Sequence, residues 1–230
     1  MTEPDPEQRP RPVPLSAASR RVLGVLVEKA KTTPDNYPMT VAALVSGCNQ
    51  KSNRAPQMDL DEDDVLLALD ELREVGAARE IQGSGRVNKY RHAAYEWLDA
   101  DSAAVAVITE LLLRGPQTVG EIRSRASRMH PLDDLGTVQA ILEALVAKEL
   151  AEPLTPPGRG QVFAHRLYPP DERQYLEAKL EKQVAGGGSG KTAPPTKPAD
   201  DAVDRILRRL SEMEGRLEIL EKRFDQLDRP

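Results

Sequence analysis

Two stretches of the chain, residues 15–92 and 99–168, carry the same succession of apolar and polar positions. Each begins with Ser-Ala-Ala and continues into an aliphatic stripe with helical spacing. A short second helix is predicted to begin at Thr40 and at Thr118, and a third helix then leads into two extended segments joined by a turn. The stripes of the first and third helices comprise Val22, Val25, Leu26, Val65, Leu69 and Leu72 in the first stretch, and Ile108, Leu111, Leu112, Val138, Leu142 and Leu145 in the second.

The order helix, helix, helix, hairpin is the plan of a winged-helix domain, and each copy is much longer than a solenoid repeat. The pattern therefore predicts a mainly α chain with small β-hairpins (α+β), built from two tandem winged-helix domains. The first domain is expected at residues 15–98, and the second, with a short C-terminal helix, at residues 99–184. A proline-rich, disordered tail (1–14), a glycine-rich flexible linker (185–200) and a coiled-coil helix (201–230) complete the expected organisation.

The expected C-terminal helix shows an unbroken alternation of three- and four-residue spacings between apolar positions, which is a heptad pattern. With the first apolar residue at position a, arginines at g face acidic residues at the following e of a parallel partner. The pattern thus predicts self-association as a parallel homodimer, with a trimer left open. The interface residues are Val203, Ile206, Leu210, Met213, Leu217, Leu220, Phe224 and Leu227.

No constellation of residues along the chain indicates an enzyme. His92, His130 and His165 lie far apart, and no pair of them has metal-ligand spacing. Cys48 follows apolar residues, as a buried and unreactive thiol would. The Gly-Ser-Gly sequence at 83–85 separates two extended segments and is interpreted as a hairpin turn, not as a phosphate-binding loop. We therefore expect no catalytic residue, no metal and no cofactor.

The third helices are poor candidates for entering a DNA groove, although that is the usual role of this element. Their outer positions are expected to be acidic in the first domain (Asp63, Asp70, Glu71 and Glu74) and small in the second (Ala140, Ala144 and Ala147, beside Glu143). An acidic face repels phosphate, and a face of small residues suits packing against another protein.

Positive and amide side chains gather elsewhere, in the loop at 49–54, on the first hairpin and on the second short helix. The candidate nucleic-acid-binding residues are Asn49, Gln50, Lys51, Asn53, Arg54, Arg86, Lys89, Arg91, Arg123 and Arg125. The three amides could reach base edges and the cations could reach phosphates. The alternative, left open, is that these residues cap helices and bind carboxylates within the protein. Thr118 and Glu121 form a capping-box pattern and need no functional role.

Composition limits these hypotheses without deciding between them. The net charge of −5 is unusual for a dedicated nucleic-acid binder, although a dimer can concentrate local positive patches. Apolar runs are too short for a membrane span, no signal peptide is evident, and a single cysteine excludes an internal disulfide. We therefore expect a cytoplasmic protein that does not enter the membrane.

Three strings resemble the YceH-like family of bacterial proteins. They are Thr-Thr-Pro-Asp-Asn-Tyr-Pro at 32–38, Cys-Asn-Gln-Lys-Ser-Asn-Arg at 48–54, and the segment at 111–126 that begins Leu-Leu-Leu-Arg-Gly. The resemblance covers residues 15–168 and implies a tandem winged-helix fold without assigning a biochemical role.

Two hypotheses of function follow. The first is a non-enzymatic, tandem winged-helix protein that binds double-stranded DNA in a regulatory role and self-associates through its C-terminal coil. The second is an adaptor whose winged helices pack on a protein partner, by analogy with subunits of bacterial chromosome-condensation complexes.

Overall fold

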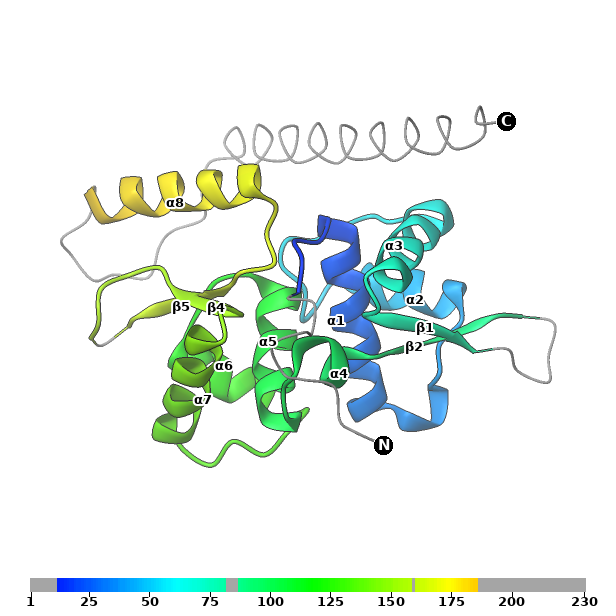
Figure 1. Cartoon of the computed structure of the whole chain (residues 1–230), viewed down its shortest axis with the longest axis horizontal. Helices are drawn as coiled ribbons and strands as arrows, with labels where there is room; N and C mark the ends of the chain where they lie inside the picture. The colour runs from blue at the N-terminus through cyan, green and yellow to red at the C-terminus, as the bar shows by residue number, and fades with distance from the viewer. Residues whose placement is uncertain (1–11, 82–86, 159, 186–230) are drawn as a thin grey trace, which may run out of the picture. The chain divides into compact units, whose positions relative to one another are not determined.

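A computed structural model describes residues 12–81, 87–158 and 160–185 of the chain. Two compact units are distinguished, residues 1–177 and 178–230, and the first contains both repeats. The described part is mainly helical with two small antiparallel sheets, as expected from the sequence (Figure 1). Some predictions lie outside the described residues: the disordered tail up to residue 11, Arg86, most of the linker (186–200) and the coiled coil (201–230).

The first repeat contains three α-helices followed by a two-stranded hairpin. Its elements are α1 (Ala17–Thr32), the 3-10 turn η2 (Pro34–Asn36), α2 (Val41–Cys48), α3 (Glu62–Glu74), β1 (Ala78–Ile81) and β2 (Lys89–His92). The hairpin strands are antiparallel, with Ala78 opposite His92. An isolated bridge between Met39 and Tyr90 ties the segment before α2 to β2.

The second repeat has the same order. After the short helix α4 (Ala94–Leu98), its elements are α5 (Ser102–Arg114), β3 (Gln117–Thr118), α6 (Val119–Ala126), α7 (Leu135–Ala147), β4 (Ala151–Pro153) and β5 (Val162–His165). Strand β5 lies between β3 and β4. Strand β3 lies directly before α6 and pairs with β5, just as the segment at Met39 lies before α2 and pairs with β2. The short helix predicted at the C-terminal end of the second domain is α8 (Pro170–Ala185).

Local sequence explains where these helices begin. Asp61 accepts a hydrogen bond from the Asp64 amide while the Asp64 carboxylate accepts one from the Asp61 amide, which closes a capping box on α3. The predicted box of Thr118 and Glu121 caps α6 in the same way. Both boxes pair amides of the first turn that a helix leaves without intrahelical partners.

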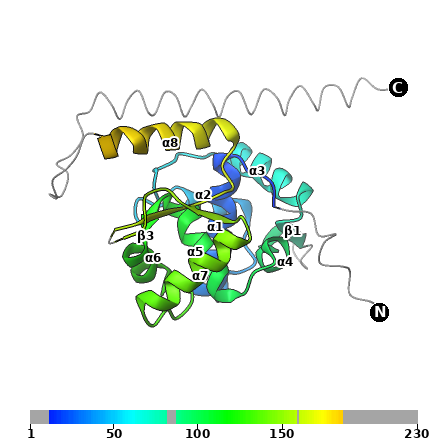
Figure 2. The ribbon, with the colours of Figure 1, turned by 60° about the vertical axis from the view of Figure 1, so that its left-hand side comes forward.

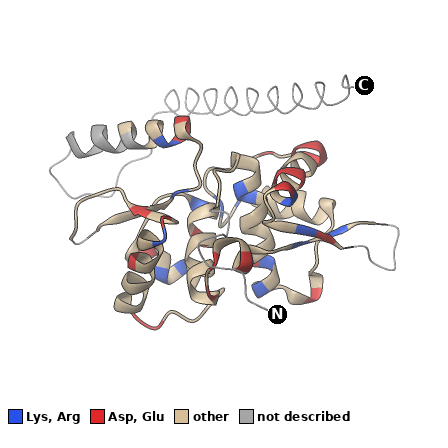
Figure 3. Ribbon diagram, viewed as in Figure 1, with Lys and Arg blue, Asp and Glu red and all other residues tan. Residues whose placement is uncertain are grey.

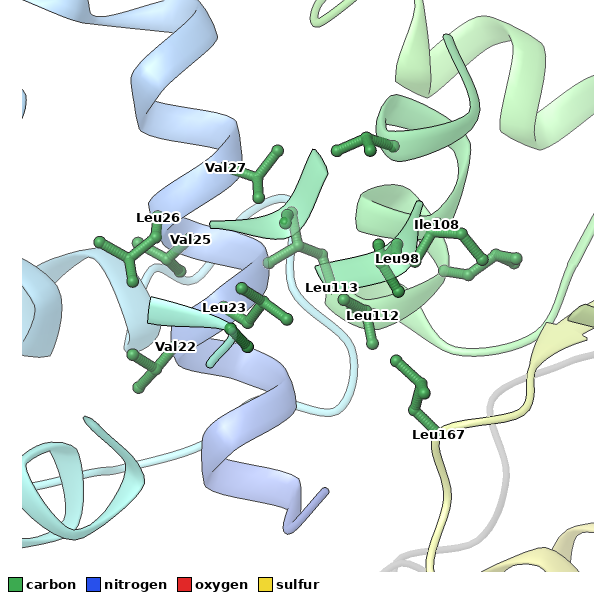
Figure 4. Packing of buried hydrophobic residues seen from close by; sticks show 14 of the residues in the cluster. Val22, Leu23, Val25, Leu26, Val27, Leu98, Ile108, Leu112, Leu113 and Leu167 are labelled. Atoms are coloured by element: carbon green, nitrogen blue, oxygen red, sulfur yellow. The ribbon is translucent and has the colours of Figure 1, made fainter. Parts of the chain in front are cut away.

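The two repeats meet where α1 packs against α5. In Figure 1 the first repeat lies to the right of this contact and the second to the left, and Figure 2 shows α1 and α5 next to each other from another side. Leu23 on α1 and Leu112 and Leu113 on α5 bring their side chains together in one buried cluster (Figure 4). Gly24 permits the close approach, because a Cβ atom there would lie 2.8 Å from Cδ2 of Leu113. A second contact joins the ends of the repeats, where the Leu15 amide donates to the Leu167 carbonyl at 3.0 Å. One apolar core therefore extends through both repeats.

Candidate nucleic-acid interface

The outer face of the β1–β2 hairpin is cationic. Strand alternation puts Arg79, Lys89 and Arg91 on one side of the hairpin, and all three side chains are exposed. The residues of the opposite side, such as Ala78 and Tyr90, are buried. We call Arg79, Lys89 and Arg91 the hairpin face; Figure 3 shows basic residues on both strands.

The charges of the hairpin face are not neutralised by neighbours. Arg79 and Arg91 are direct cross-strand partners, and like charges in this position repel each other. No carboxylate of the described residues forms an ion pair with Arg79, Lys89 or Arg91. The one acidic residue of the strands, Glu80, turns inward, where it lies 3.3 Å from Arg73. The hairpin face thus carries three positive charges that no carboxylate in the described part of the chain neutralises.

Arg54, one of the predicted DNA contacts, is engaged inside the protein. Its side chain is completely buried and forms an ion pair with Glu28 on α1 at 2.5 Å. The guanidinium also donates to the Gly47 carbonyl at 3.0 Å and to the Asn53 carbonyl at 2.8 Å. Arg54 therefore fixes the loop to the core, as the alternative interpretation of these cations expects.

The amide residues of the same loop are also engaged within the protein. Asn49 exchanges two hydrogen bonds with the backbone of Leu60, at 2.8 and 2.9 Å. Gln50 accepts from Arg54 through its carbonyl oxygen, and its side-chain amide nitrogen has no hydrogen-bond partner among the described residues. Asn53, with a positive φ of 61°, accepts from Arg114 of the second repeat. The hydrogen bonds that Asn49 and Asn53 form within the protein argue against their predicted contacts with bases.

Lys51 remains exposed at the tip of this loop, as predicted. The backbone around it is held between the repeats, because the Ala55 amide donates to the Leu113 carbonyl at 2.9 Å. The loop therefore joins the two repeats and presents one cation to solvent.

The two predicted cations of α6 also have internal partners. Arg123 donates to the backbone carbonyls of Leu132 and Asp133, at 3.3 and 2.7 Å. Arg125 donates to Gln117 at 2.6 Å and lies 3.3 Å from Glu121. Both side chains brace the helix against its own repeat, so α6 offers much less free charge than its sequence suggests.

A buried ionic network crosses the contact between the repeats. Arg128 lies 2.6 Å from Glu28 of α1 and 3.0 Å from Glu110 of α5, and both carboxylates are almost fully buried. Arg114 approaches Glu110 from the other side, at 3.1 Å. Burial raises the pKa of Glu110 above its usual value, although Arg128 and Arg114 act in the opposite direction. The network couples the two repeats through charges that neither repeat could bury unpaired.

The outer faces of the third helices largely match expectation. On α3, Asp63 and Glu74 are exposed, whereas Glu71 turns toward α1 and accepts hydrogen bonds from Ser16 and Ser19. On α7 the predicted small residues Ala140, Ala144 and Ala147 are exposed together with Glu143. Neither helix presents a cationic surface to a duplex.

Features that would indicate catalysis or metal binding are not found in the described part of the chain. No group of three or more His, Cys, Asp or Glu side chains there is placed to hold a metal ion. Cys48 is buried, and burial raises its pKa to about 12, so its thiol stays protonated. No helix of the described ranges is both long and apolar enough to cross a membrane.

The buried His165 and the half-buried His92 should make the protein less stable in acid. Burial lowers the pKa of His92 from 6.5 to about 4 and that of His165 well below 6.5. The unfolded chain therefore binds more protons than the folded one as the pH falls from 6.5 towards 4, and the free energy of unfolding should decrease. The slope is at most about 1.4 kcal/mol per pH unit for each histidine.

Urea unfolding at several pH values measures this dependence, and the variant His92→Phe should have a shallower slope than the parent. The raised pKa of Glu110 acts in the opposite direction, so the comparison with the variant isolates the histidine. Equal slopes for the two proteins would contradict the assignment.

The fold and site together define a class: a mainly helical protein with two similar repeats, joined by a buried ionic contact, and one exposed cationic hairpin. The chain belongs to the bacterial family described as "Protein of unknown function, DUF480", whose model matches residues 15–157. This confirms the resemblance to the YceH-like family. A UPF0502 protein of Rhodopirellula baltica is 62% identical over 202 residues, which cover 85% of each chain. Relatives in Geotalea uraniireducens (42% over 216 residues, 90% of each chain) and Koribacter versatilis (41% over 183 residues, 78% of this chain and 86% of the relative) are also similar.

Proposed function

We propose that the chain is a non-enzymatic tandem winged-helix protein that binds double-stranded DNA through the hairpin, or wing, of its first repeat. The observation that carries this proposal is the hairpin face, where Arg79, Lys89 and Arg91 carry three exposed charges without acidic partners among the described residues. Cations of this kind bind phosphate oxygens and release the counterions of the duplex. The regulatory role is proposed from the same fold.

Cross-strand repulsion supports a functional role for these arginines. Arg79 opposite Arg91 costs some stability, so replacing both by threonine, which favours strands, should leave the fold intact or slightly more stable. A pair that weakens the fold but strengthens binding is a known form of compromise between stability and function. A structural role would instead make the same replacement destabilising.

The double variant Arg79→Thr/Arg91→Thr should lose affinity for a fluorescent duplex, measured by anisotropy across a salt series. Because two phosphate contacts are removed, the slope of log K against log salt should become shallower by about 1.8. The control is Arg123→Ala/Lys148→Ala, which removes two charges from the second repeat. Arg123 donates to the backbone carbonyl of Asp133, and Lys148 forms an ion pair with Asp99.

Net charge changes equally in the two double variants, so they separate a local contact from a general electrostatic effect. Equal losses of affinity, or no duplex binding by the parent protein at low salt, would contradict the proposal.

The alternative function is that of an adaptor for a basic protein partner, favoured by the exposed acidic residues of α3 such as Glu62, Asp63 and Glu74. It is distinguished by the same duplex titration, because an adaptor would not bind DNA. In that case, reversing charges on α3 would weaken the complex with the protein partner. The hairpin variants would have no effect on that complex.

Self-association through residues 201–230 is proposed from the heptad spacing alone. Deletion of residues 200–230 should convert an oligomer into a monomer, as measured by sedimentation equilibrium, because it removes every a and d position of the coil. Duplex affinity should also fall, since two linked binding sites gain from effective concentration. An unchanged mass would show that the heptads do not drive assembly.

A further inference from the structure

A pocket with a mixed polar and apolar lining lies beside the hairpin face, between the end of α1, the η2 turn, α2 and β2. Its volume is about 450 Å³. The string at 32–38, one of those shared with the YceH-like family, forms its rim, and neither proposed function accounts for this segment.

The rim of the pocket is held in place by hydrogen bonds to both neighbouring elements. The Thr33 amide donates to the Lys29 carbonyl at 3.0 Å, and the His92 amide donates to the Tyr37 hydroxyl at 2.7 Å. Met39 and Tyr90 exchange two backbone hydrogen bonds, at 3.0 and 2.7 Å. The pocket is therefore part of the fold and does not depend on a loose loop.

Several lining side chains carry hydrogen-bond donors, beside the apolar Pro38, Met39 and Ala43. Lys29 and Lys89 approach from α1 and β2, and neither forms an ion pair within the described ranges. Ser46 is exposed, and the side-chain amide nitrogen of Gln50 has no hydrogen-bond partner among the described residues. Asp35 is the one carboxylate among the lining residues. Two ammonium groups, an amide and a hydroxyl are a donor set suited to phosphate oxygens.

We propose that this pocket binds a phosphate group, held by Lys29, Lys89, Ser46 and Gln50. Asp35 at the rim would repel the phosphate itself but accept a hydrogen bond from a hydroxyl carried by the same ligand. Two sources share this chemistry: the backbone of a bound duplex and a free phosphate ester of a size that fits the pocket. Phosphate recognition by the pocket holds whether or not the hairpin face binds DNA.

The test is a titration of the full-length, isotope-labelled protein with inorganic phosphate against a background of chloride, followed by amide NMR. Saturable shifts should be confined to the amides of residues 29, 33, 35, 36, 40–50 and 89. Lys29→Ala should weaken binding about fivefold, the ratio that corresponds to one surface charge pair. Lys51→Ala, which removes an exposed lysine outside the pocket, is the matched control and should bind as the parent does.

Asp35→Asn provides a second variant with the opposite sign. Asp35 is exposed, so its replacement should not disturb folding, and removal of its charge should strengthen phosphate binding. Shifts that are absent, or that respond equally to Lys29→Ala and Lys51→Ala, would overturn the proposal.

A short duplex as the second titrant identifies the source of the phosphate. If the duplex shifts the same amides and binds Lys29→Ala more weakly, the pocket holds a backbone phosphate. If inorganic phosphate binds but the duplex leaves these amides unchanged, the ligand is a free phosphate ester. The hairpin variants report on duplex binding separately, so failure of the DNA proposal does not remove the phosphate result.

Discussion

Arg54→Ala is expected to lower the free energy of unfolding by about 3 kcal/mol, because it leaves the Glu28 carboxylate buried with one of its two arginine partners. The loop at 49–56 should also loosen from α1 and α2, since Arg54 holds it to Glu28 and to the Gly47 carbonyl. Urea unfolding measures the loss. A DNA-contacting arginine would instead lower duplex affinity and leave stability unchanged.

Arg73→Ala is the matched control, because Arg73 also forms ion pairs but is exposed, with Asp70 and Glu80 as partners. Its replacement should cost less than about 1 kcal/mol. Arg54→Lys retains the charge but not the forked geometry, so it should be intermediate in stability. Equal stabilities of Arg54→Ala and Arg73→Ala would contradict the structural role.

Leu113→Ala is expected to cost about 2–5 kcal/mol, because this fully buried side chain fills the contact between α1 and α5. Its Cδ2 atom occupies the space that a Cβ at Gly24 would need. A single cooperative transition at lower urea concentration should follow, since the two repeats share one core. Leu66→Ala, at a 40% exposed position on α3, should cost much less.

A double-mutant cycle makes the contact between the repeats measurable. Gly24→Ala alone gains helix propensity but forces a contact at 2.8 Å with Leu113, so it should destabilise the parent. In the Leu113→Ala background the conflict is gone, and the same change should become neutral or stabilising. Additive effects would show that α1 and α5 do not pack in this way.

Local patterns predicted the elements well, because each depends on residues close together in the chain. The spacing of Val65, Leu69 and Leu72 follows one buried side of α3, and Thr118 with Glu121 caps α6 as their pattern indicates. The bridge of Met39 to Tyr90 could not be predicted from such patterns, since it joins segments far apart in the chain.

The site was less predictable, because its contacts join residues that are far apart in the chain. Arg54 lies in a polar string and was expected at the surface, but its partner Glu28 is on another element and Arg128 is in the other repeat. The available signal was Glu28, which directly follows the apolar run 22–27. A carboxylate buried with such a run needs a cation beside it. Arg79 was missed, although strand alternation places it with Lys89 and Arg91.

The most direct test of the central claim is a map of amide chemical-shift changes as the full-length protein is titrated with a short duplex. The account predicts the largest changes in β1 and β2, around Arg79, Lys89 and Arg91, with small changes on the outer faces of α3 and α7. Large changes along α3 or α7 with an unaffected hairpin would contradict it.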